Sequence, residues 1–360
     1  MVVCLGLVLA APMAGFAQQK SAGKALSGET RKKLLDSLNR GAAFILQQQK
    51  PDGSFDPHAG VTAVATSALM KQPGVSRAKQ LERLNKTLDY MASLAKPDGG
   101  IYQQQIPHYM TAVSVSALVA GGRPQDKAII AKGRQYLVVA MLDEGEGLAG
   151  KDKFYGGMSY GGANPDKRAD IISLEYGLAA LKDAELPADD AAWKKAIAFL
   201  QRTQNNTEVN DQKEAINDGG FVYLPGFTYH VDGGNKAYGS ATYAGILSYS
   251  WANVKKTDAR VTAVNKWIRD NYTVDENPGM KDKALYYYYM VFAKALQAVG
   301  EPVITDAAGR PHNWREELAR KLMALQLPDG SWVNANKAEM QDNKTLVTAF
   351  TPQTMAAILQ

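Results

Sequence analysis

Cysteine is almost absent from this 360-residue chain, because Cys4 is the only one. It lies within an apolar opening segment, so a chain cleaved after that segment would contain no cysteine at all. The sequence therefore excludes a disulfide framework in the mature protein, and it offers no thiolate for metal binding or catalysis. Cys4 also lies too early in the segment to be a lipid-modified cysteine at a cleavage point.

Long hydrophobic runs are also missing beyond the first seventeen residues, MVVCLGLVLAAPMAGFA, which carry no charge. Their small residues near the end are typical of a secretory signal peptide, and we expect cleavage before Gln18. This predicts a secreted or periplasmic protein with a single mature domain, residues 18–360. The lack of Lys or Arg at the start leaves open a misassigned start codon. The segment is shorter than the roughly 20 residues that cross a bilayer, so no transmembrane segment is expected.

A large excess of charge of either sign is also lacking, since the formal net charge is only +5. Lysines alternate with acids in stretches such as AELPADDAAWKKAIAFLQR, which are typical of solvated helix faces. No basic stripe of the kind that binds phosphates is present. We therefore expect no nucleic-acid partner.

What the sequence does contain is a turn that recurs six times between two kinds of helical pattern. The stretch before each turn is amphipathic, with apolar residues three and four apart, as in residues 34–46. The stretch after each turn is poor in charge and rich in Ala, Ser, Gly and Tyr, which is typical of a helix buried on most sides. The six turns contain Gly53, Gly99, Gly156, Gly219, Gly279 and Gly330.

Each unit pairs one amphipathic helix with one helix that is poor in charge. Six such pairs can bury the charge-poor helices by closing into a ring. The sequence therefore predicts an all-α protein, an (α/α)6 toroid or barrel of six helical hairpins. An open solenoid of hairpins and two unrelated helical domains are the alternatives. The absence of a composition break between the units favours one closed domain.

The first and last copies also share a motif, FILQQQKPDGSF and LMALQLPDGSW. These stretches resemble the QW repeat of the prenyltransferase and squalene-oxidase repeat superfamily. Two others, YGGMSYGGANPD and DENPGMKDKALYYYY, resemble stretches of secreted bacterial members of that superfamily. In that family a Gln near the helix end and an aromatic residue after the Gly staple neighbouring helices together. Gln49 with Phe55 and Gln326 with Trp332 match those positions. The resemblance extends over all six units and implies a terpene cyclase-like α/α toroid.

The residues that give this family its chemistry are missing. There is no Asp-x-Asp-Asp box for protonating an alkene, and the acidic pair Asp189–Asp190 is better explained as the charged start of a helix. The Cys of the zinc site is absent, as are the Cys-Gly-Glu-Gln segment of thioester domains and a DDxxD box for magnesium. We therefore expect no metal and no cofactor.

Two carboxylates are the catalytic candidates, Asp170 and Glu175, because they lie on or beside the charge-poor third inner helix. A carboxylate on so apolar a helix is costly unless it is paired or useful. The alternative is structural: Asp170 would cap the helix, and Glu175 would pair with a neighbour such as Arg168.

Ligand-binding candidates come from residues near the starts of the inner helices, where a toroid has its cavity. The long connection at residues 210–240 is a candidate binding loop. In the run Tyr286–Tyr289 successive helical side chains point about 100° apart, and we expect the stripe of Tyr286 and Tyr289 to face the cavity. The full set is His58, His108, Tyr109, Tyr160, Tyr223, His230, Tyr238, Tyr243, Tyr286 and Tyr289.

Two classes of function follow from these observations. The first is a ligand-binding or protein-interaction scaffold with a Tyr-rich cavity suited to an apolar, isoprenoid or glycan-like molecule. The second is an enzyme that acts on an isoprenoid, or on a glycan through Asp170 and Glu175. A glycan hydrolase would need these two carboxylates roughly 5 to 10 Å apart across a groove.

Overall fold

The computed structural model describes residues 26–162 and 167–360. The proposed signal segment, its cleavage point and Cys4 lie outside these residues. The regular secondary structure of the described chain is almost entirely helical, with twelve α-helices, three short 3-10 turns and one ribbon of two short strands, β1 (Ile304–Thr305) and β2 (Pro311–His312).

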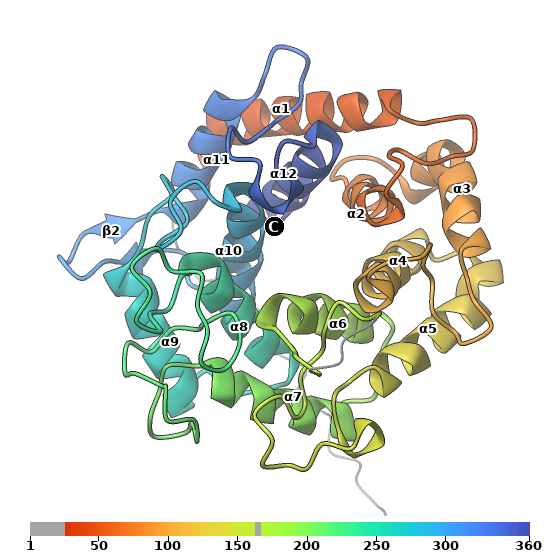
Figure 1. Cartoon of the computed structure of the whole chain (residues 1–360). Helices are drawn as coiled ribbons and strands as arrows, with labels where there is room; N and C mark the ends of the chain where they lie inside the picture. The colour runs from red at the N-terminus through yellow and green to blue at the C-terminus, as the bar shows by residue number, and fades with distance from the viewer. Residues whose placement is uncertain (1–25, 163–166) are drawn as a thin grey trace, which may run out of the picture.

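The helices alternate between an outer and an inner ring (Figure 1). The outer ring consists of α1 (Gly28–Gln47), α3 (Arg77–Ser93), α5 (Lys127–Val139), α7 (Ala191–Thr203), α9 (Ala259–Asp270) and α11 (Trp314–Leu325). The inner ring consists of α2 (Ala59–Met70), α4 (Pro107–Gly121), α6 (Ile171–Asp183), α8 (Gly239–Trp251), α10 (Leu285–Val299) and α12 (Lys344–Leu359).

The inner helices form a closed ring, because each packs against the next and α12 packs against α2. Their side chains are buried on nearly every side, whereas each outer helix buries one face and exposes the other. The prediction of an (α/α)6 toroid is therefore confirmed. The open solenoid and the two unrelated domains are excluded for the described residues.

The glycine turns place each hairpin against the next outer helix. In the first turn Oδ1 of Asp52 accepts the backbone N–H of Ser54 at 2.9 Å. Gly53 follows Asp52 with a φ of +94°, and a Cβ there would lie 2.5 Å from the carbonyl oxygen of Lys86 in α3. Only glycine fits, because the turn needs a left-handed residue and because the neighbouring backbone leaves no room for a side chain.

The two glutamines of the motif tie outer helices together. Nε2 of Gln49 donates to the Thr87 hydroxyl in α3 at 2.7 Å. At the other end of the chain Nε2 of Gln326 donates to the Ser37 carbonyl of α1 at 2.9 Å, and its Oε1 accepts from the Ser37 hydroxyl at 2.7 Å. The last hairpin is thus joined to the first, which closes the outer ring as well.

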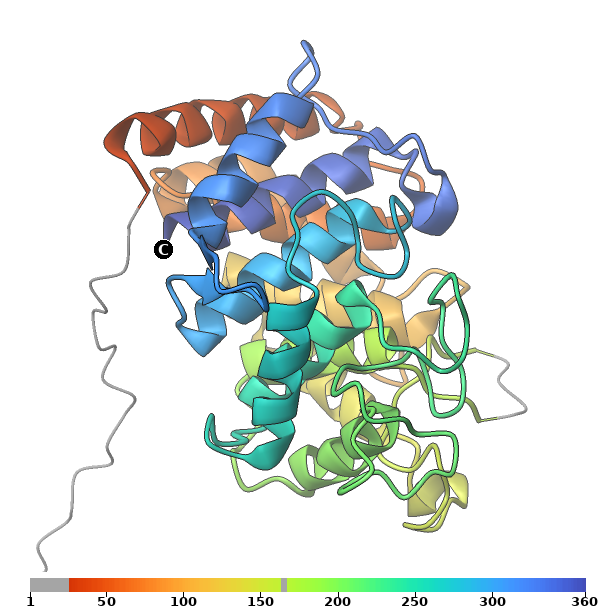
Figure 2. The same ribbon diagram turned by 90° about the vertical axis from the view of Figure 1, so that its left-hand side faces the viewer.

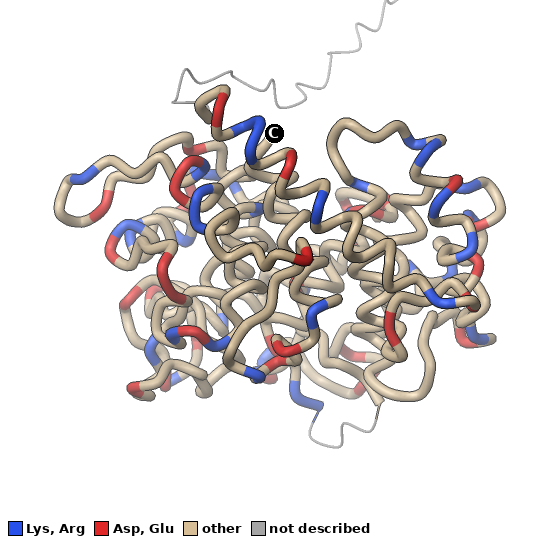
Figure 3. The backbone as a smooth tube through the Cα atoms, turned by 90° about the horizontal axis from the view of Figure 1, so that it is seen from above, with Lys and Arg blue, Asp and Glu red and all other residues tan. Residues whose placement is uncertain are grey.

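Charged residues lie around the outside of the ring, with both signs mixed (Figure 3). None of the described helices combines the length and the apolar character needed to cross a membrane.

The long connections gather at one end of the ring, where the inner helices begin (Figure 2). The longest links α7 to α8 through residues 204–238 and includes all of the expected binding loop except its last two residues, which begin α8. Its buried side chains hold it in place: Nδ2 of Asn205 donates to the Asn235 carbonyl at 2.7 Å, and Oδ2 of Asp218 accepts the Ala237 N–H at 2.8 Å. The loop therefore has a defined course over the end of the toroid.

Candidate functional site

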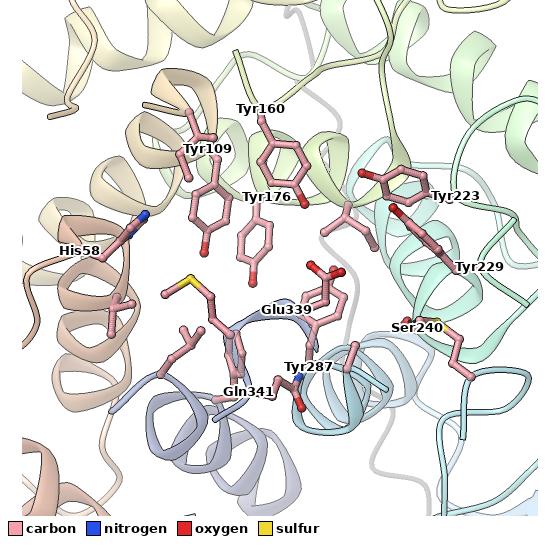
Figure 4. A pocket seen from close by; sticks show the side chains of 18 of the residues that line it. His58, Tyr109, Tyr160, Tyr176, Tyr223, Tyr229, Ser240, Tyr287, Glu339 and Gln341 are labelled. Atoms are coloured by element: carbon pink, nitrogen blue, oxygen red, sulfur yellow. Dashed lines mark hydrogen bonds between the residues drawn. The ribbon is translucent and has the colours of Figure 1, made fainter. Parts of the chain in front are cut away.

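A cavity of about 400 Å³ lies at this end of the ring, and all six inner hairpins contribute to its wall. Most of the lining is apolar or aromatic, and it includes seven tyrosines (Figure 4). The lining residues are His58, Val61, Ile106, Tyr109, Tyr160, Ile172, Tyr176, Tyr223, Tyr229, Tyr238, Ser240, Met280, Ala284, Tyr287, Glu339, Met340, Gln341, Leu346 and Phe350.

The tyrosines pack against one another across helix boundaries. The ring of Tyr109 in α4 meets the ring of Tyr176 in α6 edge-on, with centroids 4.9 Å apart. Tyr176 also lies 5.9 Å from Tyr287 of α10. Burial raises the pKa of all three phenols well above their usual range, so the hydroxyls stay protonated, and that of Tyr287 already donates to Glu175.

Asp170 is the N-cap of α6 and does not line the cavity. Its Oδ1 accepts the N–H groups of Ile172 at 3.0 Å and Ser173 at 2.8 Å, and its Oδ2 accepts the Ser173 hydroxyl at 2.7 Å. Burial raises its pKa to about 6, although these hydrogen bonds oppose the shift. The carboxylate is therefore occupied by the start of its own helix, as the structural alternative predicts.

Glu175 lies behind the cavity wall and is 1% exposed. Its Oε2 accepts the hydroxyl of Tyr287 at 3.1 Å. Burial raises its pKa to about 6, while the nearby Lys294 and the Tyr287 hydrogen bond lower it. Tyr287 is thus a hydrogen-bond partner of Glu175 that the sequence did not indicate.

Half of the expected ligand-binding residues line the cavity. His58 is the N-cap of α2, Tyr109 lies in the first turn of α4, and Tyr160, Tyr223 and Tyr238 come from the connections before α6 and α8. The N-terminal parts of the inner helices and the turns before them were the signal that identified these positions.

Tyr286 and Tyr289 do not line the cavity, which corrects the expectation for the tyrosine run. Tyr287 lines it instead. The Tyr289 hydroxyl donates at 3.0 Å to the carbonyl of Val274, in the connection between α9 and α10, and the ring of Tyr286 packs edge-on against Tyr289. The spacing placed Tyr286 and Tyr289 on one face of the helix, but it did not indicate that the face with Tyr287 turns toward the cavity.

The other three expected residues also lie elsewhere. Tyr243 is buried between α8 and α10, against Tyr288 and Phe292. His230 lies against Gly279, with its Nδ1 accepting the N–H of Asp232 at 3.1 Å. His108 faces a second cavity of about 340 Å³ with Tyr136, and its Nδ1 lies 3.3 Å from the Ser159 carbonyl.

Six lining residues with polar groups were not among the expected ligand-binding residues: Tyr176, Tyr229, Ser240, Tyr287, Glu339 and Gln341. Tyr176 and Tyr287 adjoin residues that the sequence pattern did indicate, so they differ only by the rotation of their helices. Glu339 and Gln341 lie in the last connection, where the sequence has no repeated pattern to mark them. No group of three or more His, Cys, Asp or Glu side chains in residues 26–162 and 167–360 is arranged to hold a metal ion.

Comparisons with solved structures support the fold. A variant of the type II terpene cyclase MstE from Scytonema, in complex with geranylgeranyl dihydroxybenzoate, is similar with a TM-score of 0.58 and 14% identity, covering 92% of this chain and 99% of the other. A protein from Actinoplanes has a TM-score of 0.56 and 15% identity over 91% and 100% of the two chains. A glycosidase variant has a TM-score of 0.54 and 12% identity over 93% and 99%.

These similarities define the fold class, the α/α toroid that terpene cyclases share with glycosidases of this architecture. No protein-family model matches the chain, and no curated protein matches it. At such low identity the activity of the similar proteins does not transfer with the fold.

Proposed function

We propose that this protein binds a small uncharged ligand with a mostly apolar body in the tyrosine-lined cavity. The observation that carries the proposal is the composition of the wall, which combines seven tyrosines and eight apolar side chains with a single carboxylate, Glu339. A volume of about 400 Å³ falls in the usual range of small-molecule sites, roughly 300 to 1,000 Å³.

Backbone strain at the cavity supports a binding role. Nine non-glycine residues in the described chain have positive φ, and four of them line the cavity: Ile106, Ala284, Glu339 and Met340. A β-branched residue such as Ile106, at φ 44°, is unusual in this region. Strain of this kind persists where the surrounding structure imposes it, and it gathers at ligand sites.

The mouth of the cavity is apolar as well. Tyr229 and Met340 are 38% and 43% exposed, and the exposed ring of Phe227 lies 5.1 Å from the Tyr229 ring. Exposed aromatic residues beside a cavity extend the apolar surface available to a ligand. We infer that part of the ligand rests on these side chains.

Glycan hydrolysis through Asp170 and Glu175 is not favoured. Neither carboxylate lines the cavity, since Asp170 caps α6 and Glu175 lies behind Tyr287. Two carboxylates facing each other across an open groove would be needed. The secreted or periplasmic location stays a prediction, and mass determination of the mature N-terminus would test cleavage before Gln18.

Ligand titration with thermal unfolding tests the proposal. We expect 2-ethylnaphthalene or farnesol, which are neutral and mostly apolar, to raise the melting temperature, whereas cellotetraose leaves it unchanged. Ile172 lines the cavity, and Ile172→Trp fills it, so we expect binding to weaken at least about tenfold, a difference of about 1.4 kcal/mol. Tyr155, which bonds Glu144 at the surface, provides the control Tyr155→Trp. The proposal fails if neither apolar probe binds or if both variants bind equally well.

A further inference from the structure

One buried amide in the cavity wall has incomplete hydrogen bonding. Gln341 lies in the connection before α12, lines the cavity and is 0% exposed. Its side-chain nitrogen, Nε2, has no hydrogen-bond partner. Buried polar groups are nearly always paired, so an unpaired donor in a cavity wall calls for an explanation.

The orientation of this amide is fixed by its neighbours. Oε1 of Gln341 accepts the N–H of Tyr286 at 3.1 Å and Nδ2 of Asn334 at 3.0 Å. The Asn334 amide cannot be reversed either, because its Nδ2 also donates to the Asp282 carbonyl at 2.6 Å. Two donors meet the same end of the Gln341 amide, so that end must be the carbonyl. Both Nε2–H groups therefore face away from these partners.

The start of α10 explains why the carbonyl is held there. Helix α10 follows Ala284, which has a left-handed conformation and no side chain able to cap a helix. The first N–H groups of a helix need acceptors from outside it. Gln341 supplies one to Tyr286, and this leaves its Nε2 among the side chains of the cavity wall (Figure 4).

We propose that Gln341 recognises the ligand by donating from Nε2 to a neutral acceptor oxygen, such as a carbonyl. The proposal rests on the ligand-binding function above and specifies one chemical group of that ligand. A carboxylate or phosphate does not fit, because no Lys or Arg lines the cavity and the acidic Glu339 lies in the same wall.

His58 offers a second polar contact on another side of the same cavity (Figure 4). Its Nδ1 is buried and has no hydrogen-bond partner. The wall thus presents unpaired polar atoms from α2 and from the connection before α12, within a surface that is otherwise largely apolar. This pattern is typical of a site that orients a ligand through a few placed polar groups.

A pair of probes that differ in one acceptor tests the role of Gln341: 2-acetylnaphthalene, which has a carbonyl, and 2-ethylnaphthalene, which lacks it. The quantity measured is the ratio of their dissociation constants, by fluorescence titration at pH 8. Gln341→Glu keeps an acceptor for Tyr286 but removes the donors, and Gln341→Met removes both. We expect each variant to shift the ratio against the ketone by about five- to tenfold relative to the unsubstituted protein.

Gln297→Met is the matched control, since Gln297 lies in the last turns of α10, bonds Gln360 and does not line the cavity. We expect it to leave the ratio unchanged. An unchanged ratio in both Gln341 variants overturns the assignment, while binding of 2-ethylnaphthalene would leave the proposed function standing. If neither probe binds the unsubstituted protein, the proposed function fails and this assignment fails with it. Should Gln341→Met not fold, Gln341→Glu still decides.

Discussion

Glu175 lies behind the cavity wall, and its protonation makes the free energy of unfolding depend on pH. Burial raises its pKa from 4.5 to about 6. Below pH 4.5 the group is protonated in both the folded and the unfolded chain. Between pH 4.5 and 6 only the folded chain keeps the proton, so stability from this group is lost as pH rises through that window. A shift of this size corresponds to about 2 kcal/mol.

The variant Glu175→Gln carries no charge at any pH and is expected to escape this loss. Its free energy of unfolding, relative to the unsubstituted protein, should therefore rise by about 2 kcal/mol between pH 4 and pH 8. Urea unfolding at both pH values measures the difference. Asp170, whose pKa is also raised to about 6, is present in both proteins, so its contribution cancels. A difference that stays constant with pH would show that Glu175 is not protonated near pH 5.

At the scale of residues, part of the site could be predicted and part could not. Tyr109 and Tyr160 were predictable because they lie at the start of an inner helix or in the turn before one. Tyr287 was not, because helical spacing separates the faces of α10 without showing which face turns inward. That choice depends on contacts such as the Tyr289 hydroxyl with the Val274 carbonyl. Gln341 could not be predicted from the sequence, because its role depends on the N–H of Tyr286, 55 positions away.

At the scale of elements, the glycine turns determine how closely neighbouring hairpins approach. Gly156 has a φ of +82°, and a Cβ there would lie 1.9 Å from the Lys195 carbonyl oxygen of α7. Gly309, in the β1–β2 loop, has a similar φ of +79°, but no other atom lies within 4 Å of the place that a Cβ would take. Substitution of Gly309 therefore measures the cost of backbone strain alone, whereas substitution of Gly156 adds the cost of a clash with a neighbouring helix.

Gly309→Ala is expected to cost about 1 to 2 kcal/mol of the free energy of unfolding, the usual cost of a left-handed alanine. Gly156→Ala should cost at least about 3 kcal/mol, because α7 must also move away. Urea unfolding of the two variants gives both numbers. Equal losses would mean that the turn and α7 adjust to a methyl group, and that the close approach does not hold the hairpins in place.

The helices themselves were the most predictable elements. An outer helix such as α1 shows apolar residues three and four apart, and an inner helix such as α2 contains no charged residue at all. Both signals follow from burial alone. The connections carry no such signal, and the long connection before α8 and the last one before α12 supply Tyr223, Tyr229, Glu339 and Gln341 to the cavity.

At the scale of the whole molecule, ring closure makes the first and last hairpins neighbours. Helix α12 packs against both α2 and α10, and the Arg31 side chain donates to the Leu359 carbonyl at 3.0 Å. The even composition of the six units favoured one closed domain, because no break in composition separates them. The sequence indicated only some of the contacts that close the ring, through the match of Gln326 to Gln49.

Closure has a consequence for cooperativity. Removal of residues 313–360 deletes α11 and α12 and exposes the buried sides of α2 and α10 at once. We expect the shortened chain to lose its single unfolding transition and to bind a dye for exposed apolar surface, such as anilinonaphthalene sulfonate. In an open solenoid the remaining hairpins would stay folded, because each contacts only its neighbours.

A circular permutant provides the matched comparison for this truncation. Joining Gln360 to Leu26 through a short Gly/Ser linker, with new ends between Asn253 and Val254, keeps every helix and moves only the break in the chain. Both new ends lie in the connection between α8 and α9, where no inner-ring contact is lost. We expect the permutant and the unsubstituted chain each to unfold in one transition, because closure depends on the α12–α2 contact and not on where the chain begins. Two transitions in the permutant, or one in the truncated chain, would contradict this account of the ring.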